Sequence, residues 1–447
     1  MEGVVIRSKA RTKTVHSRTS SLSQAYRGRA CCVMTGARPP HEKGSRFGKL
    51  GDPTINMTAT IIFWWTSFVG NGIAFPRLQT PSGKAMAVAD RLSSDTILDH
   101  HAAVSMIEKM REDHKSLGRD RCAPGRWDFR LHYGAVSARL HDSGMHIRVF
   151  ADDDTNLSYV KMEIAAHAAK ILGTTSGIHW SGQDNMSAPP VFFREISVVS
   201  SWRVSPHMQR IRFRADNLAR YAIGGLHIRI LIPPKGRKPI WPTIAPDGML
   251  SWPRDEDTLT VRIYTIRSID VDAGTLDVDF VLHPGLETPA ASFATNAREG
   301  QVIGMLGPGG DGVPQNKSLL IAGDDTAIPA ISRILENRRP ESTARVFLEV
   351  DSEADVVPIG NENAAVTWLF RKGRPAGTTG LLSKALRALD PAALPLDLYV
   401  WAGCEFSDFR EIRKLVRKDW NVPKDRHLVV AYWRQGANGG DRTSNDE

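Results

Sequence analysis

The sequence predicts an α+β multidomain chain: a small α/β domain, then a six-stranded antiparallel β-barrel, then a doubly wound α/β unit. At 447 residues the chain is too long for one hydrophobic core. Between 191 and 312 short alternating runs separated by turns predict strands. From Ser318 apolar strands alternate with helical segments, which indicates a parallel sheet. The expected domains are 79–175, 191–312 and 313–440, after an extension at 1–78.

The N-terminal extension carries most of the charge. Residues 1–56 hold eleven Lys/Arg and three Asp/Glu, which gives +8 of the formal net charge of +9. This segment is rich in Arg, Lys, Ser and Thr without an apolar period, so we expect it to be disordered. An upstream extension from a misassigned start, with Met57 or Met86 as the true one, is preferred to a transit peptide. Because the remainder is nearly neutral, no nucleic-acid partner is expected.

Residues 57–75 contain no charged side chain and approach the length of a membrane span. Thr, Ser, Asn and two Gly residues weaken that interpretation, so no stable membrane insertion is expected, although a signal anchor stays open as the alternative.

The four cysteines, Cys31, Cys32, Cys122 and Cys404, form no C-x-x-C pair. Their spacing fits neither a zinc site, nor a disulfide framework, nor a four-thiolate iron–sulfur cluster. We therefore predict no metal site and a reducing compartment, the cytoplasm.

In the small domain, periodicity predicts a helix from Ile97 to Leu117, three strands, and a helix from Leu157 to Leu172. The acids Asp152–Asp154 are expected to form the turn and N-cap of the second helix. Histidines and acids on the first helix, including His114, lack an H-E-x-x-H spacing and are interpreted as a solvated face.

The barrel segment offers six strand candidates and one helix, at 290–298. An antiparallel barrel buries such strands without exposed edges. The strands are expected at 198–204, 208–215, 226–233, 259–265, 275–283 and 301–307.

The last unit should bind its ligand at the carboxyl ends of its parallel strands. Strands are expected at 319–322, 345–350, 366–369, 397–402 and 426–434, with helices at 328–338, 381–389 and 407–418.

One strand of the barrel, 258–265, combines three useful side chains. Alternation puts Leu259, Val261 and Ile263 on an apolar face and Thr260, Arg262 and Tyr264 on the opposite one. A guanidinium can hold a phosphate, a Tyr ring can stack on a flat heterocycle, and a Thr hydroxyl can reach a ring nitrogen. An ordinary surface strand is the alternative.

Four ordered motifs give the chain a resemblance to a known family. The barrel strand carries R-x-Y-T, and residues 321–336 resemble the signature G-D-E-T-A-L-P-A-I-x-R-I-L-E. Residues 366–371 are similar to W-L-H-R, and 431–436 to G-Y-W-R-x-G. Together they resemble siderophore-interacting proteins, FAD-dependent NAD(P)H ferric-siderophore reductases of the ferredoxin–NADP reductase superfamily. The small domain resembles a domain of unknown function found beside that family, and this likeness implies no catalysis.

The resemblance implies that Arg262 binds the FAD phosphates, that Tyr264 lies along the ribityl and isoalloxazine, and that Thr265 lies near flavin N5, with Arg267 continuing the motif. His283 matches the histidine of D-F-V-L-H beside the cofactor. Residues 288–294 match the G-P-A-S-x-W-A segment that meets the pyrophosphate, with Thr for Gly, Phe for Trp and Ser292 one position late. That departure puts one phosphate contact in doubt.

For the nicotinamide nucleotide, NADPH or NADH, the resemblance implies the loop Gly323, Asp324 and Thr326, and the final motif with Trp433. Thr265, Asp324 and Thr326 are the catalytic candidates, while a turn in which Thr326 caps the following helix is the structural alternative. Cys404 faces the nicotinamide in one interpretation and is a buried structural cysteine in the other.

The expected substrate is a ferric siderophore, a small anionic chelate, met by a basic rim of Arg229, Lys235 and Arg237. Solvated loop charges are the alternative. The expected activity is electron transfer from NAD(P)H through FAD to Fe(III), which releases Fe(II). Another flavin oxidoreductase of the superfamily, or a non-catalytic siderophore-binding module, stays open, and oligomeric state is not predicted.

Overall fold

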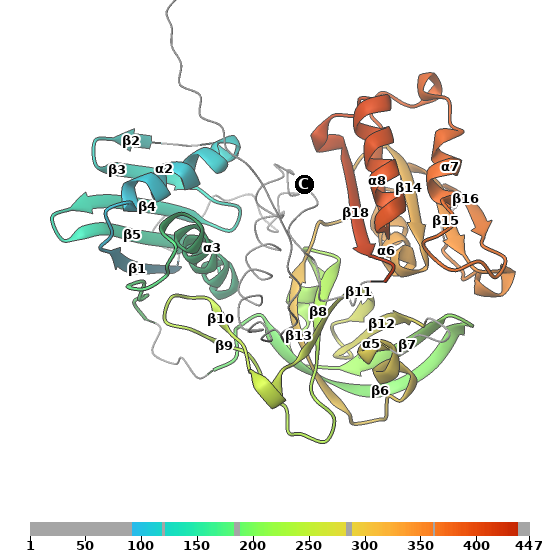
Figure 1. Cartoon of the computed structure of the whole chain (residues 1–447), viewed down its shortest axis with the longest axis horizontal. Coiled ribbons are helices and arrows are strands. Elements are labelled where there is room, and N and C mark those ends of the chain that lie inside the picture. The colour runs from blue at the N-terminus through green and yellow to red at the C-terminus, as the bar shows by residue number, and fades with distance from the viewer. Residues whose placement is uncertain (1–91, 119–120, 183–187, 283–287, 361–362, 437–447) are drawn as a thin grey trace, which may run out of the picture. The chain divides into compact units, whose positions relative to one another are not determined.

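The computed structural model describes residues 92–118, 121–182, 188–282, 288–360 and 363–436 (Figure 1). The predicted basic extension, the uncharged segment 57–75 and His283 lie outside these residues. Within the ranges described, no helix is both long and apolar enough to cross a membrane.

The small domain is a five-stranded antiparallel sheet in the order β1-β5-β4-β3-β2 with two packed helices (Figure 1). Met106, Ile107 and Met110 from α2 enter a core with residues of the sheet and of α3. Asp153 caps α3, since its Oδ1 accepts the Asn156 N–H at 2.8 Å, as the sequence predicts. The elements are β1 (Leu92–Leu98), α2 (Ala103–Asp113), β2 (Arg121–Ala123), β3 (Arg126–Arg130), β4 (Ala135–His141), β5 (Gly144–Ala151) and α3 (Asp154–Leu172).

The first predicted helix of this domain is partly wrong. Its expected start, Ile97, belongs to β1, which pairs antiparallel with β5 along its whole length. Helical periodicity begins only at Ala103, because pairing with a distant strand decides the state of the residues before it. His114, assigned to a solvated face, is only 3% exposed.

The second group of elements is a closed barrel in the order β11-β12-β7-β6-β13-β8 (Figure 1), which confirms the six-stranded prediction. Two bidentate cross-strand pairs, Arg210–Asp279 and Arg212–Asp277, join β7 to β12, with each aspartate buried. The strands are β6 (Phe193–Ser205), β7 (Met208–Arg214), β8 (His227–Ile232), β11 (Thr260–Asp270), β12 (Thr275–Val281) and β13 (Val302–Gly309), and the accessory elements are α4 (Ala219–Ala222), β9 (Thr243–Ile244), β10 (Leu250–Ser251), η4 (Asp255–Asp257) and α5 (Pro289–Thr295).

The last group is an all-parallel sheet in the order β16-β15-β14-β17-β18, as predicted. Leu319 and Ile321 of β14 enter the core shared with α6, whereas Leu320 and Ala322 enter the opposite core, shared with α7 and α8. Helices thus cover both faces, and both faces of the strand are apolar. The elements are β14 (Ser318–Asp324), η5 (Asp325–Ala327), α6 (Ile328–Asn337), β15 (Thr343–Val350), η6 (Glu353–Asp355), β16 (Ala364–Phe370), α7 (Leu381–Arg387), β17 (Tyr399–Glu405), α8 (Phe406–Lys414), its continuation Leu415–Asp419, and β18 (His427–Trp433).

Candidate functional site

The site predicted from the barrel motif lies along β11, but the two faces of that strand differ from the expected ones. Tyr264 packs on the barrel core and its ring lies 4.4 Å from that of Phe280, whereas Ile263 is 39% exposed. Thr265 is 5% exposed. In a barrel one face of each strand points inward, and sequence alternation does not tell which face another element covers.

Arg262 and Tyr264 fit the role of a cofactor grip. Arg262 is half-buried, and the contact described for its guanidinium is a 2.8 Å bond from Nη1 to the Val261 carbonyl of its own strand. That leaves the rest of the fork for a phosphate. Burial raises the pKa of Tyr264, so its phenol stays neutral. An aromatic strip continues from Tyr264 through Phe280 to Phe293.

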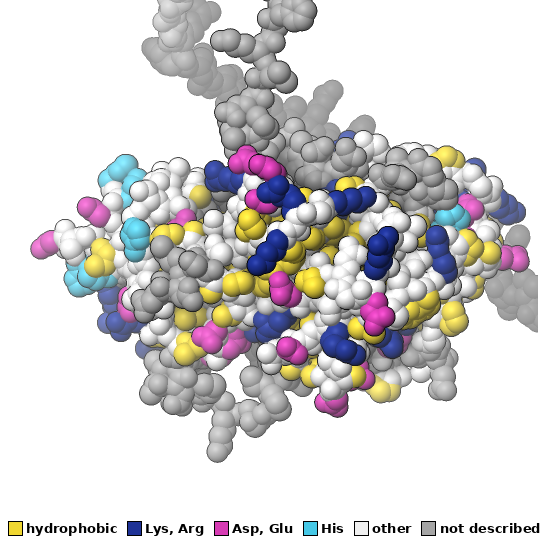
Figure 2. Space-filling view, turned by 90° about the horizontal axis from the view of Figure 1, so that it is seen from below, with side chains coloured by type: hydrophobic (Ala, Val, Ile, Leu, Met, Phe, Trp, Pro, Cys, Tyr) yellow, Lys and Arg dark blue, Asp and Glu magenta, His cyan; other side chains and the backbone are white. Residues whose placement is uncertain are grey.

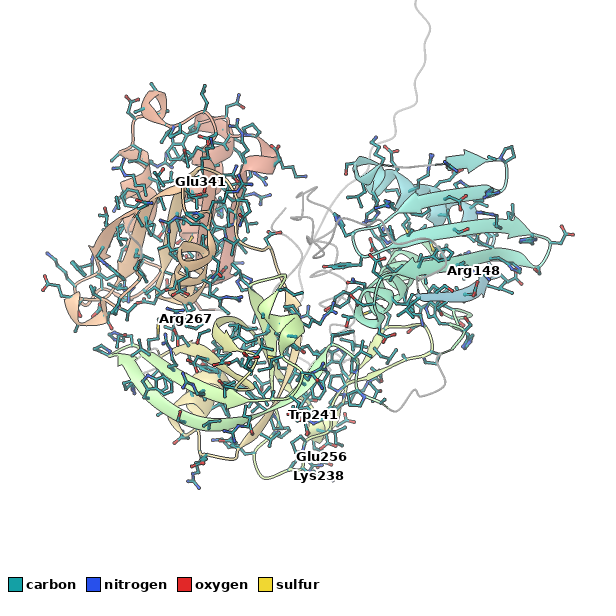
Figure 3. All side chains as sticks on the ribbon, turned by 180° about the vertical axis from the view of Figure 1, so that it is seen from behind. Arg148, Lys238, Trp241, Glu256, Arg267 and Glu341 are labelled. Atoms are coloured by element: carbon teal, nitrogen blue, oxygen red, sulfur yellow. The ribbon has the colours of Figure 1, made fainter. Side chains whose placement is uncertain are left out.

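Arg267 continues the motif, but the structure gives it a different partner. Its guanidinium donates two hydrogen bonds to Glu336 of α6, at 2.7 and 3.1 Å. Figure 3 shows Arg267 on the barrel beside the parallel-sheet unit. Arg267 therefore joins the two units, and a role at the cofactor stays a prediction.

The divergent segment 288–294 forms α5, and Thr288 is its N-cap. The Thr288 hydroxyl accepts the Ala291 N–H at 3.2 Å. Thr288, which replaces the glycine of the family motif, therefore caps the helix with its side chain. Ser292 lies inside the helix and is half-buried, with its carbonyl accepting from Asn296. Ser292 as a phosphate contact stays a prediction.

Asp324 is the centre of the carboxyl end of the parallel sheet. Its Oδ1 accepts the Thr326 N–H at 3.0 Å and the Thr326 hydroxyl, and its Oδ2 accepts the Glu405 N–H at 2.9 Å and the Trp433 indole N–H at 2.8 Å. The carboxylate is 6% exposed, and burial raises its pKa. Asp324 thus ties the ends of β14, β17 and β18 together.

This network corrects the predicted cap. Asp324, not Thr326, caps the turn after β14, because its carboxylate reaches the N–H two residues later while the Thr326 hydroxyl donates to it. Gly323 has a packing reason: a Cβ there would lie 2.6 Å from that of Ala327 and 2.7 Å from Ile331 Cδ1. Only glycine lets α6 begin so close to β14.

Cys404 is fully buried in the core shared by β17, α7 and α8, and burial raises the pKa of its thiol well above the usual value. The structure therefore supports the interpretation of Cys404 as a buried structural cysteine and argues against its contact with the nicotinamide. Arg371 is also buried; it forms a 2.6 Å ion pair with Asp325 and lies 3.9 Å from Glu349.

The barrel and the parallel sheet meet beside Thr265. Its ladder partner His227 lies 2.7 Å from the Tyr432 hydroxyl, and the two rings are 5.5 Å apart and nearly perpendicular. Burial lowers the pKa of His227 to about 4, so its imidazole is neutral. In the same region α6 contacts β11 and η5 contacts β12. Helix α6, which follows the Asp324 loop, thus lies against the strand that carries the barrel motif, and η5 of that loop lies against β12.

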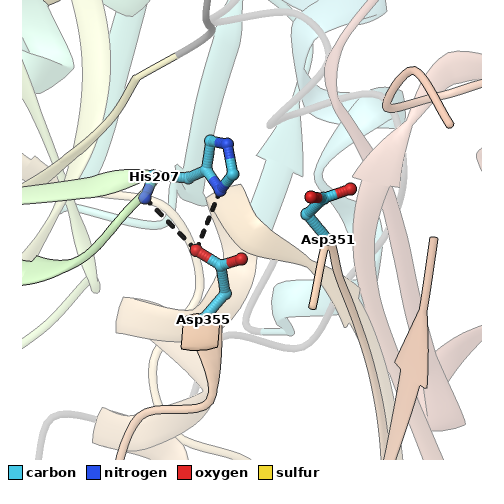
Figure 4. A group of neighbouring side chains, drawn as sticks. All are labelled: His207, Asp351 and Asp355. Carbon is cyan, nitrogen blue, oxygen red and sulfur yellow. Dashed lines mark hydrogen bonds and ion pairs between the residues drawn. The ribbon is translucent and has the colours of Figure 1, made fainter. Parts of the chain in front are cut away.

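A second junction links the turn before β7 to the end of β15 (Figure 4). Asp355 Oδ1 accepts the His207 N–H at 3.2 Å, the His207 Nδ1–H at 2.9 Å and the Ser205 hydroxyl at 3.2 Å, while Oδ2 accepts from Ser352. Asp351 lies nearby and accepts the Gly373 N–H. These three acid and imidazole groups have metal-ligand chemistry, but the Asp355 carboxylate is already satisfied, so the group acts as a clamp.

The predicted basic rim is weaker than expected. Arg237 donates to Asp257 at 2.8 Å and to Glu256 at 2.7 Å, so acids compensate its charge. Figure 3 shows Lys238 and Glu256 together at the tip of this loop. On the face drawn in Figure 2, basic and acidic side chains are interspersed around hydrophobic patches. Lys235 is exposed, and Arg229 lies on β8 opposite Ile263.

Two family models match the site-bearing part of the chain. The siderophore-interacting FAD-binding domain matches residues 197–312, and the siderophore-interacting protein model matches residues 316–436. A solved siderophore utilization protein from T. fusca is 30% identical, with a TM-score of 0.50, over 55% of this chain and 94% of that one. The chain belongs to the siderophore-interacting protein family.

Two curated relatives of this siderophore-interacting protein family member carry names that describe an activity. The ferric vibriobactin reductase of Vibrio cholerae serotype O1 is 29% identical over 253 residues, which cover 56% of this chain and 92% of the relative. The ferric acinetobactin reductase of Acinetobacter baumannii is 28% identical over 183 residues, 40% of this chain and 63% of the relative.

Sequence reasoning missed the residues that join the units of this family member. Tyr432 lies in the final motif and His227 lies in a predicted strand, so sequence reasoning could have marked each as important. Nothing in the sequence indicated that their side chains are in contact. Asp355 and His207 are 148 residues apart, and no motif marks either one.

Proposed function

We propose that this chain is a cytoplasmic, NAD(P)H-dependent, FAD-containing ferric-siderophore reductase. The observation that carries the proposal is the junction between the barrel and the parallel sheet, where α6 contacts β11, η5 contacts β12, and His227, the ladder partner of Thr265, contacts Tyr432. Family membership and the names of the relatives support the substrate class. The cytoplasm is favoured because reduced nicotinamide nucleotides are supplied there.

Each residue has a stated task in this proposal. Arg262 binds the FAD phosphates by its guanidinium fork, Tyr264 flanks the flavin, and Thr265 offers a hydroxyl at the flavin edge. Asp324 positions the loop that receives the nicotinamide, with Trp433 held against it at 2.8 Å. Arg262, Tyr264 and Thr265 would hold FAD, which when bound supplies a hydride acceptor that can pass on single electrons.

The overall reaction consumes one NAD(P)H and two ferric siderophores, and yields NAD(P)⁺, a proton, two ferrous ions and two iron-free siderophores. Hard oxygen donors hold Fe(III) more strongly than the softer Fe(II), so reduction releases the metal. The protein's part is to bind and orient its ligands, and no acid–base side chain is required at the iron. Arg229 and Lys235 would favour an anionic chelate.

The first experiment is a visible spectrum of the purified full chain, followed by anaerobic mixing with NADPH or NADH and then with a ferric siderophore plus a ferrous trap. We expect a flavin spectrum, bleaching by the nucleotide and trapped Fe(II). A colourless protein that takes up no added FAD would leave a non-catalytic siderophore-binding module. Reoxidation by ferredoxin or quinone, but not by ferric siderophores, would indicate another flavin oxidoreductase.

The matched variants are Arg262→Ala and Arg214→Ala. Loss of the Arg262 grip should weaken FAD retention by about tenfold or more, since a hydrogen bond to a charged group contributes about 1.5–3 kcal/mol. Arg214 is an exposed arginine of the same barrel, and its removal should change nothing. Equal FAD affinity in both variants would refute the role given to Arg262.

A further inference from the structure

Two neighbouring residues at the end of β18 contact two different parts of the protein. The hydroxyl of Tyr432 lies 2.7 Å from Nε2 of His227, the first residue of barrel strand β8. The indole N–H of Trp433, the next residue, donates to Asp324 at 2.8 Å. The end of one strand therefore contacts both the barrel and the loop after β14, which is proposed to receive the nicotinamide.

A β-bulge sets the direction of the Tyr432 side chain. In the pairing of β17 with β18, Cys404 lies opposite Ala431 and Glu405 lies opposite Trp433. Tyr432 is thus the extra residue of the bulge. A bulge interrupts the regular alternation along a strand and can re-aim the side chain that it carries. The shift in register therefore allows two consecutive side chains to make two different contacts.

Glycines leave room for both rings of the His227–Tyr432 pair. A Cβ on Gly403 of β17 would lie 2.9 Å from Cζ of Tyr432. A Cβ on Gly310 would lie 2.5 Å from Nδ1 of His227. The Tyr432 ring also meets the Trp401 ring at 6.1 Å and nearly at a right angle. Each ring of the pair thus occupies a space that a larger residue than glycine would close.

On the barrel, His227 lies beside the residue that is proposed to meet the flavin edge. Thr265 of β11 is the direct partner of His227 in the antiparallel ladder with β8. Side chains of directly opposed residues lie on the same face of a sheet. The Tyr432 hydroxyl therefore bonds the cross-strand neighbour of Thr265, on the face to which Thr265 belongs.

The start of β8 is anchored by further contacts. Leu226, the residue before β8, is 1% exposed and enters the core that α6 shares with the parallel sheet. Its carbonyl accepts from Arg333 of α6 at 3.4 Å and from the Ile266 N–H of β11 at 3.2 Å. Because these contacts remain without the Tyr432 hydroxyl, its loss should change the alignment of the junction and not separate the barrel from the sheet.

We propose that Tyr432 and His227 are positioning residues, whose hydrogen bond sets how closely the nicotinamide loop approaches the flavin edge beside Thr265. This inference rests on the proposed function. In the step concerned, a C–H bond of the reduced nicotinamide breaks, an N–H bond forms on the flavin, and both electrons move with the hydrogen. The reacting atoms must lie about 3–3.5 Å apart, and a misplacement of about 1 Å can slow a reaction about a hundredfold.

The competing role is purely structural, like that of the His207–Asp355 clamp. A structural bond contributes to stability and to nucleotide affinity, and its loss lowers the rate only as far as these are lost. A positioning bond acts on the rate of the bound complex. The limiting rate of flavin reduction and the nucleotide dissociation constant therefore separate the two roles.

The test compares the FAD-loaded parent chain with Tyr432→Phe in anaerobic stopped-flow mixing with NADPH or NADH. We expect the limiting rate of flavin reduction to fall about tenfold or more, with the dissociation constant of the nucleotide and the FAD content within about twofold of the parent. His227→Gln keeps an amide in reach of the hydroxyl, so it should be reduced faster than His227→Ala. Tyr399→Phe makes the same chemical change at the amino end of β17 and should match the parent.

Hydrogen exchange of the FAD-free chain gives a readout that needs no turnover. Without the bond, amides of β8 and of the end of β18 should exchange about fivefold faster in Tyr432→Phe. Gly403→Ala keeps the hydroxyl but displaces the Tyr432 ring, so it should reproduce both the slower reduction and the faster exchange. Near-UV circular dichroism checks folding, and Tyr432→Phe decides if Gly403→Ala does not fold.

Four results would overturn the inference: reduction of Tyr432→Phe at the parent rate, a rate loss matched by an equal loss of nucleotide affinity, unchanged hydrogen exchange, or His227→Gln no faster than His227→Ala. A parent chain that binds no FAD, or that NAD(P)H does not reduce, would overturn the proposed function and this inference with it. The parent chain alone therefore distinguishes failure of the proposed function from failure of the positioning role.

Discussion

Replacing Asp324 with Asn tests whether this carboxylate positions the nicotinamide loop. Asp324 accepts four hydrogen bonds, two on each oxygen. Asn keeps one oxygen, which should turn to the buried Glu405 N–H and Trp433 indole. The Thr326 donors then lose their acceptor, although Thr326 is half-exposed and water can replace part of it.

The expected cost follows from these contacts. A hydrogen bond to a charged group contributes about 1.5–3 kcal/mol, so two lost bonds would cost about 3–6 kcal/mol without compensation. Water at Thr326 and relief from burying a charge offset part of this, because burial already raises the Asp324 pKa. We expect a net loss of about 2 kcal/mol for Asp324→Asn and about twice that for Asp324→Ala.

Urea unfolding followed by tryptophan fluorescence measures the loss, with Asp351→Asn as the control at the end of the neighbouring strand β15. Trp433→Phe should remove one of the four bonds and be less than additive with Asp324→Asn. Stopped-flow reduction by NAD(P)H gives the second readout, and we expect weaker nucleotide binding with stability lost in parallel. Unchanged stability with a collapsed reduction rate would show that Asp324 acts in the chemistry instead.

Three further changes probe the network around the site. Burial raises the pKa of Glu349 to about 7, so its ionisation destabilises the fold as pH rises from about 4.5 to 7. The free energy of unfolding of Glu349→Gln, relative to that of the parent, should therefore increase by about 2 kcal/mol from pH 5 to pH 8. A difference in unfolding free energy that stays constant between these two pH values would contradict this. A double-mutant cycle on Arg267 and Glu336 should give a coupling of about 0.5–1 kcal/mol that falls with salt, and a salt-independent value would exclude an ion pair. Asp355→Asn should cost about 1–3 kcal/mol in urea unfolding, while His207→Gln alone should cost less, because the Ser205 and Ser352 bonds remain; equal costs would refute the clamp.

The order of elements was readable from the sequence because local patterns carry it. Hydrophobic period and flanking turn residues predict both the barrel strands and the parallel strands. The R-x-Y-T motif marks one barrel strand, and the G-D-D-T motif marks the end of the first parallel strand. Pairing along the sheets then agrees with those local preferences, so prediction and structure coincide there. β1 is the exception, since its state depends on β5, some fifty residues away.

The sequence by itself determined the fold class and the two motif strands of this protein, because strand period, helix period and turn chemistry are local properties. Tertiary structure alone decided which side chains meet: Asp324 with Trp433, His227 with Tyr432, and His114 with Glu163. These pairs join residues many positions apart, and their contact depends on how sheets and helices pack. The same packing buried Cys404, which one interpretation of the sequence placed at the nicotinamide. It also buried His114, which the sequence analysis assigned to a solvated helix face.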